Sequence, residues 1–224
     1  MKLRFLGQSG FQIQHGEHEV VIDPFVSQNP ASPVEASELS PSHILLTHAH
    51  GDHYGDTPDI AKRTGATVVG AVEIAQYVSQ HGMEGHGMNI GGSFQFPFGR
   101  VQFTPAWHSS SFPDGTYGGM PTGIVLEMDG KRLYHAGDTG LFSDMRLIGR
   151  KGLDLAMLPI GDFFTMGPDD ALEAVKLLAP KAVIPIHYNT FDAIAQDAQA
   201  FKVRVESETD ARCLVLEPGD STEL

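Results

Sequence analysis

The chain has 224 residues, with 28 Asp and Glu against 15 Lys and Arg, and its formal net charge is −13. The single cysteine excludes an internal disulfide, and the absence of a clustered basic segment argues against a nucleic-acid partner. No apolar run approaches the roughly 18 residues of a membrane span, and the first residues lack the core of a signal peptide. We therefore expect an acidic, cytoplasmic protein without a membrane partner. The unusual count is that of histidine, with 11 residues.

The first half of the chain predicts short strands interrupted by two helices. Apolar and β-branched segments bounded by Gly, Pro or polar residues predict strands over residues 3–6, 11–15, 19–23, 43–47 and 67–70. Residues 48–53 then form the loop after the fourth of these strands. Helices are expected over residues 57–63, where Pro58 stands in the first turn, and over 72–80.

The second half predicts hairpins followed by alternating strands and helices. The hairpins pair residues 93–98 with 100–107 and 122–128 with 131–135, and the long loop 109–121 connects them. Further strands over 153–159, 181–186 and 213–216 alternate with helices over 168–178 and 193–203. Sheets that pack together under covering helices imply an α/β fold, a four-layer αββα sandwich. No linker divides the chain.

The segment from Thr47 to His53 contains the pattern H-x-H-x-D-H. His48 and His50 are one residue apart, so in an extended turn both can point to the same side. Asp52 and His53 follow and aim at an adjacent point. Four such donors on so short a loop cannot converge on one tetrahedral ion and also leave room for substrate. Two neighbouring metal ions fit the pattern better.

Three further donors each follow the end of a predicted strand. They are His108, Asp138 and His187. Loops at strand ends are common places for scaffolded sites. A carboxylate at Asp138 could bridge two ions.

These motifs resemble those of the metallo-β-lactamase superfamily. THAHGDH, the isolated His108, the Asp in HAGDTG and the late His187 match its motifs in order, and IDPF at 22–25 is similar to its first motif. Within the superfamily, AWHSSSFPDGTYGG, YHAGDTGLFSDM, LPIGDFFTMGP and VIPIHYNTF resemble the UPF0173 metal-dependent hydrolases, a group similar to the ascorbate-6-phosphate lactonase branch. The resemblance implies one metallo-β-lactamase-like hydrolase domain over residues 1–224.

Carried over residue by residue, the resemblance implies ligands for two divalent ions. They are His48, His50 and His108 for the first ion, Asp52, His53 and His187 for the second, and Asp138 as a bridge. Asp52 and Asp138 are the expected catalytic residues, and zinc is the expected metal, with manganese and iron as alternatives. Asp23 would orient a ligand or the metal loop. One departure is Gln8, because the related segment often reads G-H-x-x-F.

Four other residues are candidates for contact with substrate or support of the site. Ser109 and Tyr117 belong to the loop 109–121, which leaves the site directly after His108. Asp162 either faces the site or caps its own turn. Tyr188 either donates a hydrogen bond to a developing oxyanion or packs beside the metal loop.

The resulting functional hypothesis is a dinuclear hydrolase for a small-molecule substrate. Two ions would hold a hydroxide that attacks a lactone, ester or phosphodiester bond, and the branch resemblance extends the substrates to phosphorylated ones. Two alternatives use the same ligands: a metal-binding sensor without turnover, and a di-iron redox protein. Association into a homo-oligomer is left open.

Overall fold

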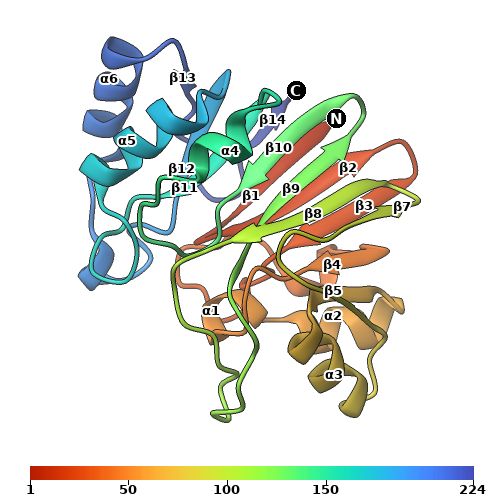
Figure 1. Cartoon of the computed structure of the whole chain (residues 1–224). Coiled ribbons are helices and arrows are strands. Elements are labelled where there is room, and N and C mark those ends of the chain that lie inside the picture. The colour runs from red at the N-terminus through yellow and green to blue at the C-terminus, as the bar shows by residue number, and fades with distance from the viewer.

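Two seven-stranded sheets pack face to face in the computed structural model, which describes residues 1–224 (Figure 1). Helices cover the outer face of each sheet. The predicted four-layer αββα sandwich is therefore confirmed. None of the helices combines the length and the apolar character needed to cross a membrane.

The first sheet has the strand order β14-β1-β2-β3-β4-β5-β6, and its strands from β3 to β6 run parallel. Its strands are β1 (Lys2–Gly7), β2 (Gly10–His15), β3 (His18–Ile22), β4 (His43–Leu45), β5 (Thr67–Ala71), β6 (Gly85–Met88) and β14 (Ser221–Glu223). The helices on this side are η1 (Ala36–Glu38), α1 (Gly51–Tyr54), α2 (Thr57–Thr64) and α3 (Val72–Gln80).

The second sheet has the strand order β13-β12-β11-β10-β9-β8-β7. Its strands are β7 (Ser93–Phe96), β8 (Gly99–Pro105), β9 (Thr122–Met128), β10 (Lys131–His135), β11 (Leu155–Pro159), β12 (Ala182–Ile186) and β13 (Arg212–Cys213). The helices on this side are α4 (Met145–Gly149), α5 (Pro168–Leu178), η2 (Asp192–Ile194) and α6 (Ala198–Glu208).

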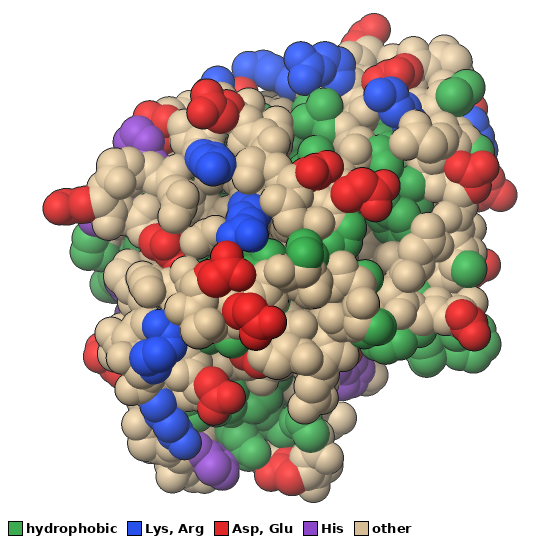
Figure 2. All heavy atoms as spheres, turned by 180° about the vertical axis from the view of Figure 1, so that it is seen from behind, with side chains coloured by type: hydrophobic (Ala, Val, Ile, Leu, Met, Phe, Trp, Pro, Cys, Tyr) green, Lys and Arg blue, Asp and Glu red, His purple; other side chains and the backbone are tan.

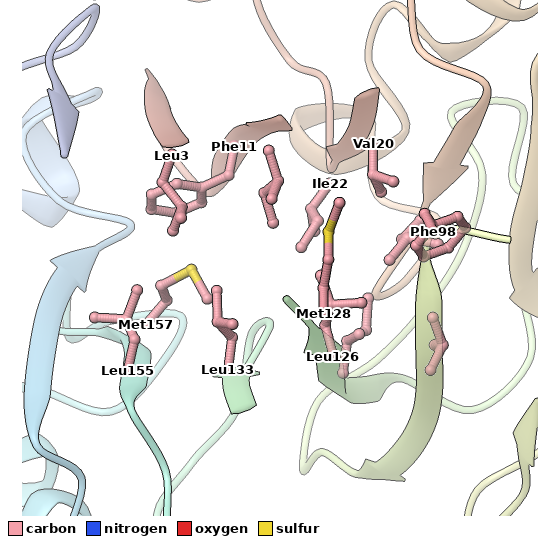
Figure 3. Close-up of a cluster of buried hydrophobic side chains, with 14 of the residues drawn as sticks. Leu3, Phe11, Val20, Ile22, Phe98, Leu126, Met128, Leu133, Leu155 and Met157 are labelled. Carbon is pink, nitrogen blue, oxygen red and sulfur yellow. The ribbon is translucent and has the colours of Figure 1, made fainter. Parts of the chain in front are cut away.

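The largest hydrophobic cluster lies between the two sheets. Leu3 and Phe11 from the first sheet face Leu133, Leu155 and Met157 from the second (Figure 3). Side chains alternate between the faces of a strand, so each sheet sends one set of apolar residues into this layer and the other set under its helices. The sandwich is thereby a rigid support for the loops at its edges.

Several predicted elements differ from the structure in their boundaries. The strands expected over 43–47 and 213–216 are shortened to His43–Leu45 and Arg212–Cys213. The end of the expected loop 48–53 belongs to the single helical turn α1, in which the backbone N–H groups of His53 and Tyr54 both donate to the carbonyl of His50. The helix expected over 193–203 begins instead at Ala198, because the Asp197 side chain accepts hydrogen bonds from the N–H groups of Gln199 and Ala200 and caps it there.

Several short elements have no counterpart in the prediction. They are β6, α4, β14 and the two 3-10 turns. The sequence over β6 is glycine-rich and lacks strand periodicity, so it is ordered by pairing with β5 rather than by its own preference. By contrast, the expected bounds of α3 and α5 agree with the structure.

Candidate metal centre

The candidate ligands come from one edge of the sandwich, where several strands end. His48 follows β4, and Asp23 follows the parallel neighbour β3. His108, Asp138 and His187 follow β8, β10 and β12, which run in the same direction in the second sheet. The carboxyl ends of these strands therefore bring residues more than 130 positions apart in the chain to one place.

The first group of donors contains His48, His50 and His108. Their ligand atoms all lie within 4.8 Å of one another. His48 Nε2 is 3.0 Å from His50 Nδ1. Donor atoms that share an ion at bonds of about 2.0–2.2 Å lie roughly 3–3.6 Å apart, so this spacing fits a common ion.

The second group contains Asp52, His53, Asp138 and His187, again with ligand atoms within 4.8 Å of one another. His187 Nε2 is 3.0 Å from Asp138 Oδ2 and 3.4 Å from Asp52 Oδ2. His53 Nε2 is 3.3 Å from Asp138 Oδ1. Two imidazoles and two carboxylates suit zinc, manganese or iron.

Asp138 lies between the two groups. Its Oδ2 atom is also 3.6 Å from Nε2 of His108, which belongs to the first group. One buried carboxylate thus approaches imidazoles from both groups, which is the position expected of a bridge.

Buried atoms without partners support the fit of this donor set to metal ions. His53 Nε2 and Asp138 Oδ1 are buried and have no hydrogen-bond partner in the protein. Leaving such an atom without any partner costs about 1–3 kcal/mol, and a bound metal ion would remove that cost by taking the lone pair. The two atoms face each other across the site, where an ion would satisfy both.

Asp23 is linked to one histidine of each group, directly to His53 and through Thr47 to His48. It is fully buried, and its Oδ2 accepts hydrogen bonds from His53 Nδ1 at 2.8 Å and from Thr47 Oγ1 at 2.6 Å. Because the Thr47 hydroxyl donates to Asp23, it accepts from His48 Nδ1, 3.0 Å away. Both imidazoles therefore carry a proton on Nδ1 and turn Nε2 towards the site, where its lone pair can bind an ion once Nε2 is unprotonated.

Two residues that contact the donor groups are not evident from the sequence. Thr47 stands directly before the motif but has no signal of its own, and Gln8 is visible only as a departure from the usual histidine. The Gln8 side chain donates to Asp52 Oδ2 at 2.8 Å, and its backbone carbonyl accepts from the N–H of His187 at 2.8 Å. Gln8 therefore contacts two residues of the second group, Asp52 through its side chain and His187 through its backbone.

Three of these supporting and donor residues have left-handed backbone conformations. The φ angles are 54° for Gln8, 44° for Asp23 and 55° for His187. Residues other than glycine adopt this region at a cost of roughly 1–3 kcal/mol, and they concentrate at functional sites. Gly137, with φ of 62°, supplies the same conformation directly before Asp138. A Cβ atom there would lie 2.9 Å from the Thr122 carbonyl oxygen.

The two groups differ in protonation. Burial lowers the pKa of His48, His50 and His108, so these imidazoles are neutral at pH 7. Burial also opposes charge on His187, but the Asp138 and Asp52 carboxylates outweigh it and raise its pKa to about 9. The pKa of His53 is raised well above its usual value, since Asp138, Asp52 and Asp23 outweigh its burial.

The sequence is similar to those of known proteins. Residues 18–188 match the model of the beta-lactamase superfamily domain. A UPF0173 metal-dependent hydrolase of Thermus thermophilus is 54% identical over 220 residues, covering 98% of this chain and 97% of the relative. That of Pelotomaculum thermopropionicum is 52% identical over 229 residues, covering all of both chains. This chain belongs to the UPF0173 metal-dependent hydrolase family.

A solved structure agrees with this family assignment. Igni18, a metallo hydrolase from the hyperthermophilic archaeon Ignicoccus hospitalis, is 40% identical to this UPF0173 chain and superimposes with a TM-score of 0.91. The match covers all of this chain and 98% of Igni18. The resemblance inferred from the motifs is thus confirmed, together with the hydrolase class and the metallo-β-lactamase type of fold.

A cavity of about 690 Å³ opens above the donor groups of this UPF0173 protein. Its lining residues are Phe25, Gln28, His50, Gly51, Asp52, His108, Ser109, Asp138, Phe164, His187 and Phe191. Ser109 Oγ also lies 3.4 Å from His50 Nε2. Ser109 therefore lies at the cavity, beside His50.

Most of the loop 109–121 supports the site from outside rather than lining the cavity. Phe112 is buried and stacks on Tyr77, with ring centroids 3.6 Å apart. Ser110 Oγ accepts a hydrogen bond from the N–H of Ala49, the residue between His48 and His50 in the chain. Tyr117, expected as a substrate contact, is 60% exposed and does not line the cavity.

Asp162 and Tyr188 also lie outside the cavity lining. The Asp162 backbone carbonyl closes its own turn by accepting from the N–H groups of Phe164 and Thr165, and its exposed side chain makes no hydrogen bond. Tyr188 packs against the hydrophobic cluster under α5 and α6, and burial raises the pKa of its hydroxyl to about 12. The geometry therefore favours the turn role for Asp162 and the packing role for Tyr188.

The protonation difference makes metal loading of this UPF0173 protein depend on pH. At pH 7 the second donor group must release the protons of His53 and His187 when it binds an ion, whereas the first group releases none. Below about pH 9, where His187 is protonated, the affinity of the second group should fall by roughly tenfold per pH unit, and more steeply wherever His53 is protonated as well. Titration calorimetry with zinc in buffers of different ionisation enthalpy would count these protons. Equal proton release by both groups would contradict this expectation.

Proposed function

We propose that this UPF0173 protein is a dinuclear metallohydrolase that cleaves a small-molecule lactone, ester or phosphodiester bond. The observation that carries the proposal is the position of Asp138, whose carboxylate lies 3.0–3.6 Å from imidazole nitrogens of both donor groups at the floor of an open cavity. His48, His50 and His108 would hold one ion, and Asp52, His53 and His187 the other, with Asp138 bridging. Zinc is the proposed metal.

When bound, the ions supply an activated water nucleophile at neutral pH and polarise the carbonyl or phosphoryl oxygen of the substrate. The chain contributes position and proton transfer. Asp52 lines the cavity and accepts the Gln8 amide through Oδ2, which leaves Oδ1 to accept the proton of the attacking water and to return it to the leaving group. Burial would raise the pKa of Asp52, but His53 and His187 outweigh it and lower it, so the group is ionised at pH 7.

The proposed substrate is a small molecule rather than a nucleic acid. A duplex or RNA substrate would need several cations spaced along its phosphates. Lys and Arg side chains lie in small groups among Asp and Glu on the face shown in Figure 2. No lysine or arginine lines the cavity itself.

The test is removal and restoration of metal. Protein purified without added metal is analysed for zinc, manganese and iron, then stripped with a chelator and reloaded with each ion. Activity on a panel of esters, lactones and phosphodiesters is expected to disappear on stripping and to return at two ions per chain. Full activity at one ion per chain would refute the dinuclear proposal. Metal binding without turnover on any member of the panel would favour a sensor.

A further inference from the structure

Aromatic side chains form much of the wall of the cavity above the donor groups. Phe25, Phe164 and Phe191 line it, and its only charged side chains belong to the candidate ligands themselves. The other polar side chains on the wall are those of Gln28 and Ser109. An apolar wall with a few polar groups is typical of a site for a small organic molecule.

We propose that this cavity selects an uncharged ester or lactone that carries an apolar group of about the size of a phenyl ring. The proposal rests on the hydrolase function proposed above and narrows its substrate class. It excludes phosphorylated substrates, which the sequence resemblance had included. A phosphate away from the reacting bond would find no cationic side chain to pair with, because the wall offers none.

The position of Phe164 is set by a tight turn. Asp162 and Phe163 both adopt left-handed conformations, with φ of 58° and 49°. The turn is tied to the donor loop because the N–H of Met166 donates to the carbonyl of Thr139, the residue after Asp138. Phe164 is therefore held in place while its ring stays 55% exposed.

Phe191 is held in a comparable way on the other side. The N–H of Ile194 donates to the Phe191 carbonyl, and the N–H of Asn189 donates to the carbonyl of Ile194. The Gln196 side chain donates a hydrogen bond to the carbonyl of Gly161, the residue directly before the turn that carries Phe164. The two loops thus form one connected frame, and Phe191 remains 43% exposed.

Exposed rings on an ordered frame are suited to binding. Covering apolar surface is favourable, while ordering flexible side chains opposes binding. Here the backbone that carries both rings is already ordered, so an apolar group gains the contact with little loss of chain entropy. The cavity volume of about 690 Å³ also leaves room for more than an acetyl group.

The first measurement compares three p-nitrophenyl esters on the zinc-loaded protein: the acetate, the 3-phenylpropanoate and the 3-phosphonopropanoate. The kcat/KM of the phenylpropanoate is expected to exceed that of the acetate by about tenfold or more. The phosphonate ester is expected to be at least about tenfold poorer than the phenylpropanoate, because nothing on the wall compensates its charge.

The second measurement uses variants. Phe164→Ala and Phe191→Ala should each lower the ratio of kcat/KM for phenylpropanoate over acetate by about tenfold. Phe94→Ala is the matched control, because Phe94 is 47% exposed but lies on β7, outside the cavity lining. It should leave the ratio unchanged.

A binding measurement separates this inference from the proposed function. The uncharged ketone 4-phenyl-2-butanone cannot be hydrolysed, and its binding to metal-free protein can be followed by NMR. Binding that weakens in Phe164→Ala and Phe191→Ala, together with no hydrolysis of any ester or lactone, would refute the proposed ester and lactone hydrolysis but retain the apolar site.

Metal-dependent hydrolysis with an unchanged ratio and unchanged ketone binding in both variants would overturn the inference alone. If the ratio and the ketone binding were unchanged but the two variants differed from the unmutated protein in oligomeric state by size-exclusion chromatography, a second copy of the chain would cover these rings, and the inference would again be overturned. A faster reaction of the phosphonate ester than of the phenylpropanoate would also overturn it.

Discussion

Replacing Asp138 by alanine should remove the shared ligand of the two donor groups and abolish turnover. Its carboxylate approaches His53, His108 and His187, so no neighbouring side chain can replace it. We expect kcat/KM to fall by roughly 10³-fold or more, since in the proposed dinuclear mechanism the activated water and the polarised substrate both require paired ions. Metal analysis should show fewer than two ions per chain.

The matched control for this variant is Asp170→Ala. Asp170 is exposed on the helix α5 and lies outside the cavity lining. This variant should keep both its metal content and its turnover. Circular dichroism would establish that Asp138→Ala is still folded. A folded Asp138→Ala protein with two bound ions and full activity would place the catalytic centre elsewhere.

Replacing Asp23 by asparagine should weaken metal binding at both donor groups, although Asp23 is a ligand of neither. Its two oxygens accept three hydrogen bonds, from the Thr47 N–H, the Thr47 hydroxyl and His53 Nδ1. An asparagine amide group would turn a donor towards at least one of these donors. Loss of such partners typically lowers metal affinity or activity by about 10–100-fold. The free energy of unfolding should also decrease by about 1–3 kcal/mol.

Competition with a chromophoric chelator would measure the affinity of each group in Asp23→Asn. Nitrogen-15 NMR of the histidines would report whether His48 and His53 lose their Nδ1–H form. Asp59→Asn is the control, because Asp59 is exposed on α2. If metal affinity decreased only at the second donor group, the hydrogen-bond connection from Asp23 through Thr47 to His48 would be contradicted. Unchanged affinity at both groups would contradict the orienting role of Asp23 itself.

The candidate donor residues could be predicted from the sequence because each is marked by its near neighbours in the chain. His48, His50, Asp52 and His53 stand within six positions, and a short loop forces them close together whatever surrounds it. The late histidine, His187, follows an apolar run that reads as a buried strand. A ligand-type residue at a strand end is visible in the sequence since strand periodicity depends only on near neighbours.

The hydrogen bonds that support the donor residues could not be predicted from the sequence, because they join residues far apart in the chain. Gln8 and Asp52 are 44 positions apart, and their hydrogen bond exists because the turn between β1 and β2 reaches the loop that carries Asp52. The boundary of α6 depended on which of several polar residues became its cap, and Asp197 took that place. Tyr117, Asp162 and Tyr188 had plausible chemistry, but their loops turn them away from the cavity.

The sequence by itself determined the sandwich class, the family and which residues are candidate metal donors, because ligand motifs and strand patterns depend on residue type and short spacing. Only the tertiary structure decided which side chains line the cavity. Phe25, Phe164 and Phe191 come from three separate loops, and each loop's direction depends on hydrogen bonds to distant backbone, such as Met166 to Thr139. The conformation of a loop is set by those long-range bonds and not by its own residue preferences.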